Sequence, residues 1–392
     1  MKIRIAVIFG GRSVEHEVSV ISALQAVANM DPEKYDITPV YLTKTNELYI
    51  GEKIGDITAY RDIKSLLAAS IRVLLLNEND RFFIINYPQK RYGKNIKKEI
   101  DLAFPIVHGT NTEDGTVMGF IKTMGIPLVG CDVTAAAVGM DKYIMKTVFK
   151  DNDIPVLDCV RFNLSDYKDV EGMIKKTEKK LSYPVIVKPV NSGSSVGISV
   201  AKDKDELTDS IDTAFTFANT IIIERAIKNL QEINCSVLGD ADNARASLCE
   251  EPFHTEDILS YEDKYMSGGK GSKSGSKGMA SVSRKVPADI PDDMTKRIQE
   301  LAVKAFKVLN CCGVVRFDFM IDKDSKELFL NEINTIPGSL AFYLWEPAGL
   351  PYREMLDEMI ELALKRTRDE KRVTFSFETN ILDQASFSGV KK

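Results

Sequence analysis

The sequence predicts a mixed α/β fold, with α+β character in part, that is divided into two or three domains. The chain has 392 residues, which is enough for that number of domains of ordinary size. Its composition, 44% hydrophobic and 28% charged residues, is that of a globular protein. Short apolar runs that are typical of buried strands alternate along the chain with segments of helical periodicity. These three observations together favour the α/β architecture.

Charge and hydropathy narrow the range of partners. The formal net charge is −5, which gives no reason to expect a nucleic acid or an anionic membrane as partner. No run of 18 or more apolar residues occurs, so no transmembrane helix is expected. The opening segment MKIRIAVIFGG fits a first β-strand better than a signal peptide, because its apolar run ends in two glycines and a polar segment.

The six cysteines are scattered along the chain, and none of them forms a C-x-x-C pair. Neither a zinc site nor a disulfide framework is therefore indicated. Reduced thiols fit a cytoplasmic protein, so we expect a cytoplasmic location. The three histidines are too few for a His-rich metal site.

The N-terminal part begins with a strand, a glycine turn and a helix. Residues 3–9 (IRIAVIF) form a nearly continuous apolar run of the kind that is buried in parallel sheets. The turn GGRS follows, and a helix is expected from about residue 14 to residue 28. This arrangement makes a corner that can bind an anion or another ligand, and Glu15 lies in it. The competing interpretation is that Glu15 only supplies a favourable charge to the helix dipole.

The rest of the first domain continues the α/β pattern. A second strand is expected at residues 36–43, and residues 50–100 are predicted to be a polar, irregular insertion with short β-like runs. A further buried strand at 101–107 leads into a polar loop, HGTNTEDG, that begins at His108. Open α/β sheets bind ligands in loops of this kind, although a plain surface loop is an equal alternative. The first domain is expected to end near Gly139.

The strongest local signal in the middle of the chain is a Gly/Ser-rich loop between two strands. Residues 184–189 (PVIVKP) precede the loop VNSGSSVG, and residues 198–201 follow it. Small residues let a phosphate approach closely, backbone N–H groups and hydroxyls donate to it, and Lys188 supplies positive charge. The loop is not a P-loop, because G-K-[ST] is missing, and a hairpin with a flexible tip is the simpler alternative.

Two acidic residues are candidates for recognising an adenine and a ribose. Residues 219–224 (NTIIIE) form an apolar strand that ends in Glu224, and Glu232 follows a few residues later. Either side chain could equally be a solvated loop charge. A cationic Gly/Ser-rich loop at 267–278 is expected to be mobile, as a linker or as an active-site lid. Two further helices and a polar tail are expected at 291–309, at 354–365 and from 366 onwards.

Residues 316–338 (RFDFMIDKDSKELFLNEINTIPG) predict two short strands joined by the polar turn DKDSK. Residues two apart share a face of a strand, so Arg316 and Asp318 point the same way, as do Glu332 and Asn334. The register that the apolar residues favour makes an arginine, two carboxylates and an amide converge. Hard cations such as Mg²⁺ bind oxygen clusters of this kind. The alternative is a solvated face with an incidental ion pair.

Six motifs resemble, in the same order, those of the D-alanine–D-alanine ligase family of the ATP-grasp superfamily. They are GGxSxEHE at 10–17, HG with EDG at 108–115, MDK at 140–142, VKP with GSSVG at 187–197, KY at 264–265, and RxD with NExNTxPG at 316–338. No single motif is decisive, but the ordered set is highly specific. The resemblance extends from about residue 3 to residue 365.

The resemblance implies a three-domain ATP-grasp fold. An N-terminal Rossmann-like domain with a parallel sheet would span residues 1–139 and bind substrate. Two α+β ATP-grasp subdomains, at 140–240 and 241–366, would hold the nucleotide between them. The lid loop and the tail would lie at 260–280 and 367–392.

The implied activity is an ATP-dependent, ADP-forming ligation. ATP phosphorylates the carboxylate of a first D-alanine, and the amine of a second D-amino acid attacks the acyl phosphate. The product would be a D-Ala-D-Ala dipeptide for peptidoglycan precursors in cell-wall synthesis. The implied cofactors are ATP and two Mg²⁺ (or Mn²⁺), and the implied assembly is a homodimer that acts on small-molecule substrates.

The resemblance also assigns roles to individual residues. The metal ligands would be Asp318, Glu332 and Asn334. The nucleotide would contact Lys142, Lys188, Ser195, Glu224, Glu232 and Lys264. The catalytic set would be Glu15, His108, Ser194, Tyr265, Arg316 and Gly338. In this set Arg316 and the Gly338 N–H would form an oxyanion hole, and Glu15 would bind the ammonium of the first substrate. Glu15, Ser194 and Tyr265 would form a hydrogen-bonded set that closes the lid, and His108 would lie near the second subsite.

Two features bear on the second substrate. In the family, a tyrosine at the place of Tyr265 accompanies a D-amino acid as second substrate, whereas relatives that use D-lactate carry histidine. The run SLAFYLWE at 339–346 departs from the family pattern of Thr and Ser residues, and Tyr343 falls where a serine is common. A D-Ala–D-Ser or other D-X ligase therefore stays open.

Two other classes of function remain as alternatives. One is an ATP-grasp carboxylate–amine ligase of specialised metabolism, which would share the metal site and differ in the pocket around 339–346. The other is a catalytically silent nucleotide-binding protein. The intact set of Lys, Asp, Glu, Asn and Arg side chains argues against the silent protein.

Overall fold

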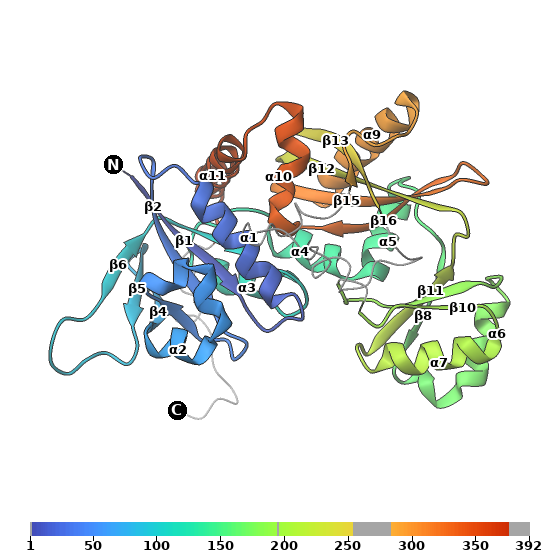
Figure 1. The fold of residues 1–392 in the computed structure, drawn as a ribbon, viewed down its shortest axis with the longest axis horizontal. Coiled ribbons are helices and arrows are strands. Elements are labelled where there is room, and N and C mark those ends of the chain that lie inside the picture. The colour runs from blue at the N-terminus through green and yellow to red at the C-terminus, as the bar shows by residue number, and fades with distance from the viewer. Residues whose placement is uncertain (1, 194–195, 254–283, 376–392) are drawn as a thin grey trace, which may run out of the picture.

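The computed structural model describes residues 2–193, 196–253 and 284–375 (Figure 1). Within these ranges the chain forms three β-sheets, of seven, four and five strands, with helices packed around them. The fold is therefore the mixed α/β arrangement that the sequence predicts.

The N-terminal sheet has the strand order β6-β5-β4-β3-β2-β1-β7. Its strands are β1 (Ile3–Gly10), β2 (Tyr35–Leu42), β3 (Leu48–Ile50), β4 (Ile71–Glu78), β5 (Arg81–Asn86), β6 (Lys97–Ile100) and β7 (Leu102–Ile106). Strand β1 pairs in parallel with β2 and β7, and the strands from β2 to β6 pair in antiparallel fashion. Among the described strands, the parallel part of this sheet thus comprises β2, β1 and β7.

The prediction of an irregular insertion at residues 50–100 needs correction. The apolar runs in this segment form β4 and β5, which pair along their length and extend the first sheet. Val73 is buried, whereas Leu74 next to it is 41% exposed, so one face of β4 packs on the core and the other faces solvent. The residues between β3 and β4 form two 3₁₀ turns and a short helix, η1 (Glu52–Gly55), η2 (Ile57–Arg61) and α2 (Ile63–Ala68).

A glycine turn links β1 to helix α1 (His16–Asn29). Gly10 and Gly11 have φ angles of +97° and +94°, which favour glycine. A Cβ on Gly11 would also lie 2.3 Å from the Thr112 side chain, so no larger residue fits there. The helices that follow β7 are α3 (Thr116–Thr123), α4 (Val133–Met140) and α5 (Lys142–Asp151).

The four-stranded sheet has the order β10-β9-β11-β8. Its strands are β8 (Cys159–Asn163), β9 (Val185–Pro189), β10 (Ser199–Ala201) and β11 (Thr220–Arg225). The 3₁₀ turn η3 (Asp166–Asp169) and helices α6 (Val170–Glu178) and α7 (Lys204–Phe215) accompany them. Buried side chains of both layers, including Met173, Val187 and Ile211, form one hydrophobic core.

The five-stranded sheet has the order β14-β13-β12-β15-β16. Its strands are β12 (Leu230–Gly239), β13 (Ala244–Pro252), β14 (Arg284–Lys285), β15 (Gly313–Asp322) and β16 (Leu328–Asn334), and helix α9 (Asp292–Val308) packs on β12 and β13. Phe317 and Phe319 point into the core beside Phe306 of α9. The intervening residues of β15 are therefore turned to the opposite face.

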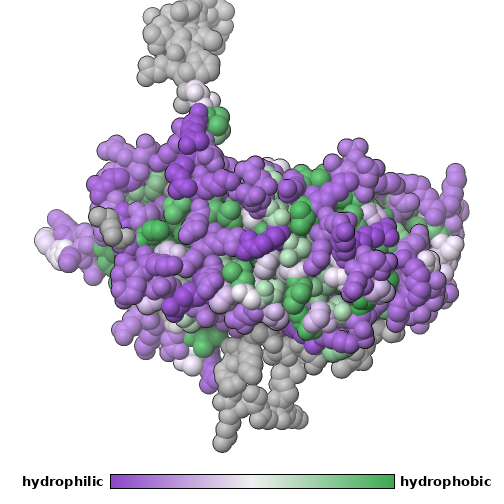
Figure 2. Space-filling view, turned by 90° about the horizontal axis from the view of Figure 1, so that it is seen from above, coloured by the Kyte–Doolittle hydropathy of each residue, from purple (hydrophilic) through white to green (hydrophobic). Residues whose placement is uncertain are grey.

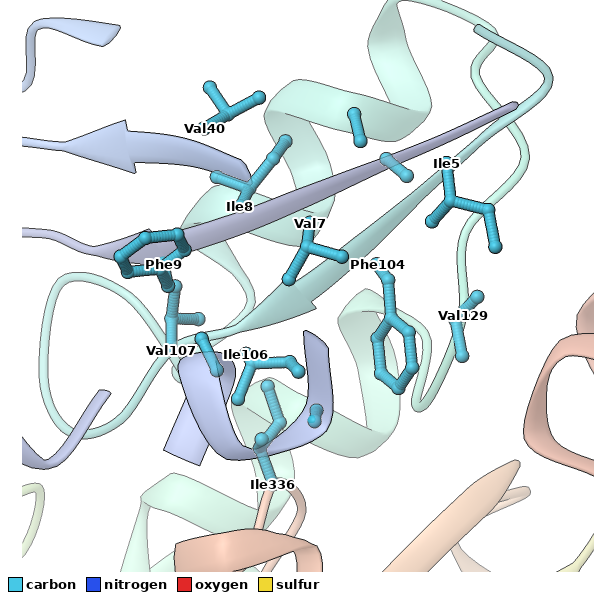
Figure 3. Packing of buried hydrophobic residues seen from close by; sticks show 14 of the residues in the cluster. Ile5, Val7, Ile8, Phe9, Val40, Phe104, Ile106, Val107, Val129 and Ile336 are labelled. Carbon is cyan, nitrogen blue, oxygen red and sulfur yellow. The ribbon is translucent and has the colours of Figure 1, made fainter. Parts of the chain in front are cut away.

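The C-terminal elements pack against the N-terminal sheet. They are η5 (Gly338–Ala341), α10 (Phe342–Trp345), η6 (Glu346–Ala348) and α11 (Tyr352–Glu370). Met355 and Met359 of α11 belong to the same hydrophobic cluster as Ile5 and Phe104, and Figure 3 shows Ile336 close to the N-terminal strands of that cluster. Helix α11 also extends five residues beyond its predicted end at residue 365, and Arg366 in this last part donates to the Gly130 carbonyl over 2.8 Å.

Hydrophilic side chains dominate the face of the molecule that Figure 2 shows, and hydrophobic side chains appear between them in small patches. None of the helices in the described ranges combines the length and the hydropathy that crossing a membrane requires.

Candidate active site

The β15–β16 hairpin presents a polar face on which four predicted site residues meet. Arg316 and Asp318 lie directly opposite Asn334 and Glu332, respectively. The Arg316 guanidinium donates two hydrogen bonds to the Asp318 carboxylate, at 2.6 Å from Nε to Oδ1 and 2.7 Å from Nη2 to Oδ2. Asn334 Nδ2 donates to Asp318 Oδ2 over 3.0 Å. The arginine, two carboxylates and amide thus converge as the strand alternation predicts.

A buried charge cluster lies on the four-stranded sheet and α5. Lys146 Nζ and Lys188 Nζ are each 2.8 Å from a different oxygen of the Glu224 carboxylate. Burial by itself would raise the pKa of Glu224, but the two ammonium groups outweigh it and hold the pKa at about 2. One anion between two lysines leaves an excess of positive charge, which suits a phosphate group.

Two lysines connect this region to the hairpin. Lys142 Nζ donates to the Ser192 carbonyl over 2.7 Å and lies 3.7 Å from Glu332 Oε2. Lys188 Nζ donates to Asn331 Oδ1 over 3.2 Å. The predicted phosphate lysines and the predicted metal ligands therefore occupy one continuous site between two sheets.

A third group of polar residues lies where the N-terminal sheet meets the C-terminal elements. His108 is buried, and its Nε2 is 3.0 Å from Ser22 Oγ, which also accepts the backbone N–H of Ser339 over 2.9 Å. Burial, with the Arg316 charge acting in the same direction, lowers the pKa of His108 to about 4. The imidazole is consequently neutral at pH 7.

Glu113 joins the same two parts of the chain. Its carboxylate accepts the backbone N–H of Gly109 over 3.1 Å and that of Ile336 over 2.9 Å. The Thr335 hydroxyl donates to the same carboxylate over 3.3 Å. Burial and the Glu15 charge raise the pKa of Glu113 to about 7, against the effect of these hydrogen bonds. Glu113 therefore keeps a proton to a higher pH than an ordinary glutamate.

Glu15 is the residue before α1 and is itself buried. A Cβ on Gly109 would lie 2.6 Å from Glu15 Oε2, and one on Gly193 would lie 2.4 Å from it. Both glycines are therefore needed for the close approach of the Glu15 carboxylate. This contact brings the predicted ligand corner of the first sheet against the Gly/Ser-rich loop.

The segment after Gly338 has an unusual backbone and an aromatic side chain beside Arg316. Ser339, Leu340 and Ala341 have φ angles between +51° and +54°, which side-chain-bearing residues rarely adopt. The Tyr343 hydroxyl lies 3.4 Å from Arg316 Nη1, and the Arg284 guanidinium lies 3.7 Å above the Tyr343 ring. Tyr343 thus lies between two arginines.

The other predicted site residues are placed as follows. Glu232 lies half-buried on β12 opposite Met320, and Gly338 is the first residue of η5. Four predicted residues lie outside the described residues: Ser194, Ser195, Lys264 and Tyr265.

The polar face of the hairpin carries oxygen donors that suit a divalent cation. Carboxylate and amide oxygens of Asp318, Glu332 and Asn334 are donors that Mg²⁺ accepts. Among the described residues, no group of three or more His, Cys, Asp or Glu side chains is placed to hold a metal ion. Mg²⁺ commonly binds through one or two carboxylates together with substrate phosphates, so two carboxylates fit a metal that arrives with a nucleotide.

Three residues that shape the site have no role among those predicted from the sequence. Lys146 stands four positions after Lys142 on α5, and this helical spacing was the available signal for a second inward lysine. Glu113 lies inside the HGTNTEDG loop, but nothing in the sequence indicates its contact with Ile336. Arg284 follows the Gly/Ser/Lys loop and gives no local signal of its ion pair with Glu250.

The sheets and their shared polar site define the class of this protein, which has the ATP-grasp fold. Two family models match: D-ala D-ala ligase N-terminus over residues 4–131 and D-ala D-ala ligase C-terminus over residues 148–361. The chain belongs to the D-alanine–D-alanine ligase family and is an ATP-dependent, ADP-forming ligase.

Individual relatives agree over nearly the whole chain. A protein from Acetivibrio thermocellus named D-alanine–D-alanine ligase is 39% identical, over 94% of this chain and 97% of its own. The D-alanine–D-alanine ligase structure from Coxiella burnetii is 28% identical with a TM-score of 0.76, and covers 95% of this chain and 96% of its own. The VanG D-Ala:D-Ser ligase structure from Enterococcus faecalis is 33% identical with a TM-score of 0.75, and covers 93% of this chain and 100% of its own.

Proposed function

We propose that this chain joins two molecules of D-alanine into the dipeptide D-Ala-D-Ala for peptidoglycan precursors. The observation that carries the proposal is the continuous site in which Lys142 and Lys188 reach the polar face of the hairpin. A phosphoryl transfer needs positive charge on one side and metal-binding oxygens on the other, and this site supplies both.

The first step transfers the γ-phosphoryl group of ATP to a carboxylate oxygen of the first D-alanine and releases ADP. Lys142, Lys188 and the charge cluster around Glu224 hold the phosphates against the hairpin. Asp318, Glu332 and Asn334 would hold two divalent cations, Mg²⁺ or Mn²⁺, which would neutralise charge on the phosphates. No covalent bond to the protein is required.

The second step forms the peptide bond. The amine of the second D-alanine attacks the carbonyl carbon of the acyl phosphate, the C–O bond to phosphate breaks, and the proton that the amine loses passes to the leaving phosphate. Arg316 and the Gly338 N–H stabilise the oxyanion of the tetrahedral intermediate. Asp318 fixes the Arg316 guanidinium through two hydrogen bonds, so the charge is oriented before the reaction.

The N-terminal residues bind and orient the first substrate. Glu15 accepts its ammonium group at the junction with Gly109 and Gly193. His108 is neutral, so it adds no positive charge beside Arg316 and is able to accept a hydrogen bond near the second subsite. The roles of Ser194, Ser195, Lys264 and Tyr265 remain predictions from the sequence.

D-alanine is the proposed second substrate, although a D-Ala:D-Ser ligase structure is also similar. The curated relatives that are 34–39% identical carry the name D-alanine–D-alanine ligase. A homodimer and a cytoplasmic location belong to the same proposal. All six cysteines are unpaired in the structure, which supports a reducing compartment.

A substrate panel tests the proposal. Purified protein with ATP and Mg²⁺ is given D-alanine alone, or D-alanine with D-serine, D-lactate or L-alanine, and phosphate release and product mass are measured. We expect ADP, phosphate and D-Ala-D-Ala from D-alanine alone. Phosphate release that requires one of the other acceptors, with no dipeptide from D-alanine alone, would contradict the proposal.

A further inference from the structure

A cavity of about 520 Å³ lies in the N-terminal part of the chain, outside the site described above. Its borders are one face of α1, the turn after β2, η2 and α2. Small-molecule sites in proteins typically have volumes of roughly 300–1,000 Å³, with mostly apolar walls and a few polar groups. The size and position of this cavity therefore suit an organic molecule.

The walls are predominantly apolar. Helix α1 contributes Val20 and Ile21, and α2 contributes Ile63 and Leu67. Ile57 and Ile63 at the rim are each 37% exposed, although they are large aliphatic residues. An apolar body placed between α1 and α2 would remove these side chains from water, which favours its binding.

Some of the polar groups that line the cavity already have partners within the chain, and these are less available to a ligand. The Tyr60 hydroxyl donates to the Ile54 carbonyl over 2.9 Å, and Lys44 forms an ion pair with Glu17 at 2.8 Å. Arg61 is exposed at the rim and forms no ion pair with the described part of the chain. A ligand therefore meets one uncompensated positive charge, which selects for an anionic group.

The inner wall of the cavity is connected to the active site through His16. The His16 ring lies between two polar groups, with Nδ1 2.6 Å from the Gly11 carbonyl oxygen and Nε2 2.9 Å from the Tyr41 hydroxyl. A carbonyl only accepts hydrogen bonds, so Nδ1 carries the proton and the Tyr41 hydroxyl donates to Nε2. His16 thus holds the glycine turn that precedes Glu15, and the same side chain lines the cavity.

We propose that this cavity is an effector site for an organic anion with an aromatic or aliphatic body. The body lies between α1 and α2, and the anionic group meets Arg61. A bound molecule contacts Tyr41 and His16, and displacement of either side chain alters the glycine turn and the position of Glu15. Binding therefore weakens the affinity for the first substrate.

Calorimetric titration with 8-anilinonaphthalene-1-sulfonate, an arylsulfonate with one negative charge, tests the binding directly. The protein is first saturated with a non-hydrolysable ATP analogue, so that the nucleotide site is occupied. We expect one saturable site. Ile63→Trp fills the cavity and should weaken binding about tenfold. Arg61→Glu reverses the charge at an exposed position and should weaken it about fivefold.

Matched controls distinguish this cavity from general adhesion of the probe. Ile71→Trp makes the same change at an isoleucine of β4 that is 39% exposed and does not line the cavity. Arg297→Glu reverses an exposed charge on α9. Both controls should bind the probe like the parent protein. Unchanged affinity in Ile63→Trp, or equal losses in Ile71→Trp, would overturn the site.

Steady-state kinetics tests the coupling, and this part alone rests on the proposed function. The probe should raise the KM for the first D-alanine about threefold at a saturating concentration, with kcat unchanged. The same concentration should raise the KM of Ile63→Trp less than that of the parent protein, because the variant binds the probe more weakly. Binding by calorimetry without a change in KM would overturn the effector role, and a protein without ligase activity would still report on the binding site.

Discussion

The Glu224 carboxylate holds two lysines of the proposed phosphate site in place. This carboxylate is fully buried and would be costly there alone. Lys146 and Lys188 compensate it, and in turn Glu224 fixes the directions in which the two lysines reach. Removing the carboxylate would leave two buried lysines without their counter-charge. The buried positions of Lys146 and Lys188 therefore depend on Glu224.

Glu332 is the residue whose substitution most directly tests the metal assignment. Glu332→Gln keeps the size of the side chain but removes the charge, so kcat/KM should fall about 100-fold or more. Its side chain is 27% exposed, so the melting temperature should change by no more than about 2 °C. Turnover and thermal unfolding of the same preparation measure the two effects.

The matched control for that substitution is Glu327→Gln. Glu327 precedes the same strand, and its side chain is 58% exposed in a 3.4 Å ion pair with Arg225. Turnover of this variant should match the parent. Near-normal turnover in Glu332→Gln would exclude Glu332 as a metal ligand.

Glu113 predicts a pH dependence of stability. The pKa of Glu113 is about 7 in the folded chain and about 4.5 in the unfolded chain, so the folded state binds the extra proton between these values. The contribution of Glu113 to the free energy of unfolding is consequently complete below pH 4.5. It is lost as the pH rises through 7, by roughly 3 kcal/mol. The variant Glu113→Gln cannot titrate and should lose less stability over this range.

The measurement is urea unfolding of the parent and of Glu113→Gln at pH 5 and pH 8. The free energy of unfolding of the variant, relative to that of the parent, should increase between the two pH values. A constant difference would show that Glu113 is ionised in the folded chain at both.

At the scale of elements, the β15–β16 hairpin could be predicted and the contacts between elements could not. Alternation of apolar and polar residues places Arg316 and Asp318 on one face, and the turn residues fix where the strands reverse. The register shift after Asp318 has no sequence signal, because a bulge depends on the packing of both strands. Lys188 and Asn331, which are 143 positions apart, meet only because two sheets pack together.

The left-handed segment Ser339–Leu340–Ala341 predicts a conflict between stability and activity. The Ser339 hydroxyl is buried and has no hydrogen-bond partner among the described residues, and its backbone conformation favours glycine. Ser339→Gly should therefore increase the free energy of unfolding by about 1 kcal/mol. If the hydroxyl serves the second substrate, the KM for that substrate should increase about tenfold.

Lys326→Gly is the control for this substitution. Lys326 has a φ angle of +62° in the exposed turn of the hairpin, so glycine should also stabilise the chain there by about 1 kcal/mol. The KM of this variant should equal that of the parent. Equal KM values in both variants would show that the Ser339 hydroxyl does not contact the substrate.

At the scale of the whole molecule, the site is assembled from all three sheets. The sequence motifs identified the family because each element end carries its own local pattern. They did not identify Glu113, whose importance comes from linking Gly109 to Ile336 across 227 positions of the chain (336 − 109). Contacts between residues so far apart in the sequence depend on the complete fold, and no periodicity in the sequence indicates them.

The whole-molecule prediction concerns removal of the metal. On the proposed metal-binding face of the hairpin the two carboxylates Asp318 and Glu332 lie opposite each other, and no group of three such ligands occurs among the described residues. The metal should therefore bind together with the nucleotide and not to the chain alone. EDTA should abolish turnover, and excess Mg²⁺ or Mn²⁺ should restore it. The melting temperature without nucleotide should be the same with and without EDTA. A large fall in this temperature on adding EDTA would indicate a metal that the chain binds without nucleotide.

Helix α11 has a consequence for folding of the chain during its synthesis on the ribosome. The first sheet is synthesised early, yet Met355, Leu356 and Met359, which cover part of it, are among the last residues of its core to emerge. Asp357 of the same helix also accepts hydrogen bonds from Lys34 and Tyr35. The nascent N-terminal sheet must therefore expose an apolar surface until α11 has been synthesised. A chain that is cut short before α11 should be a client of chaperones, even though every strand of its first sheet is present.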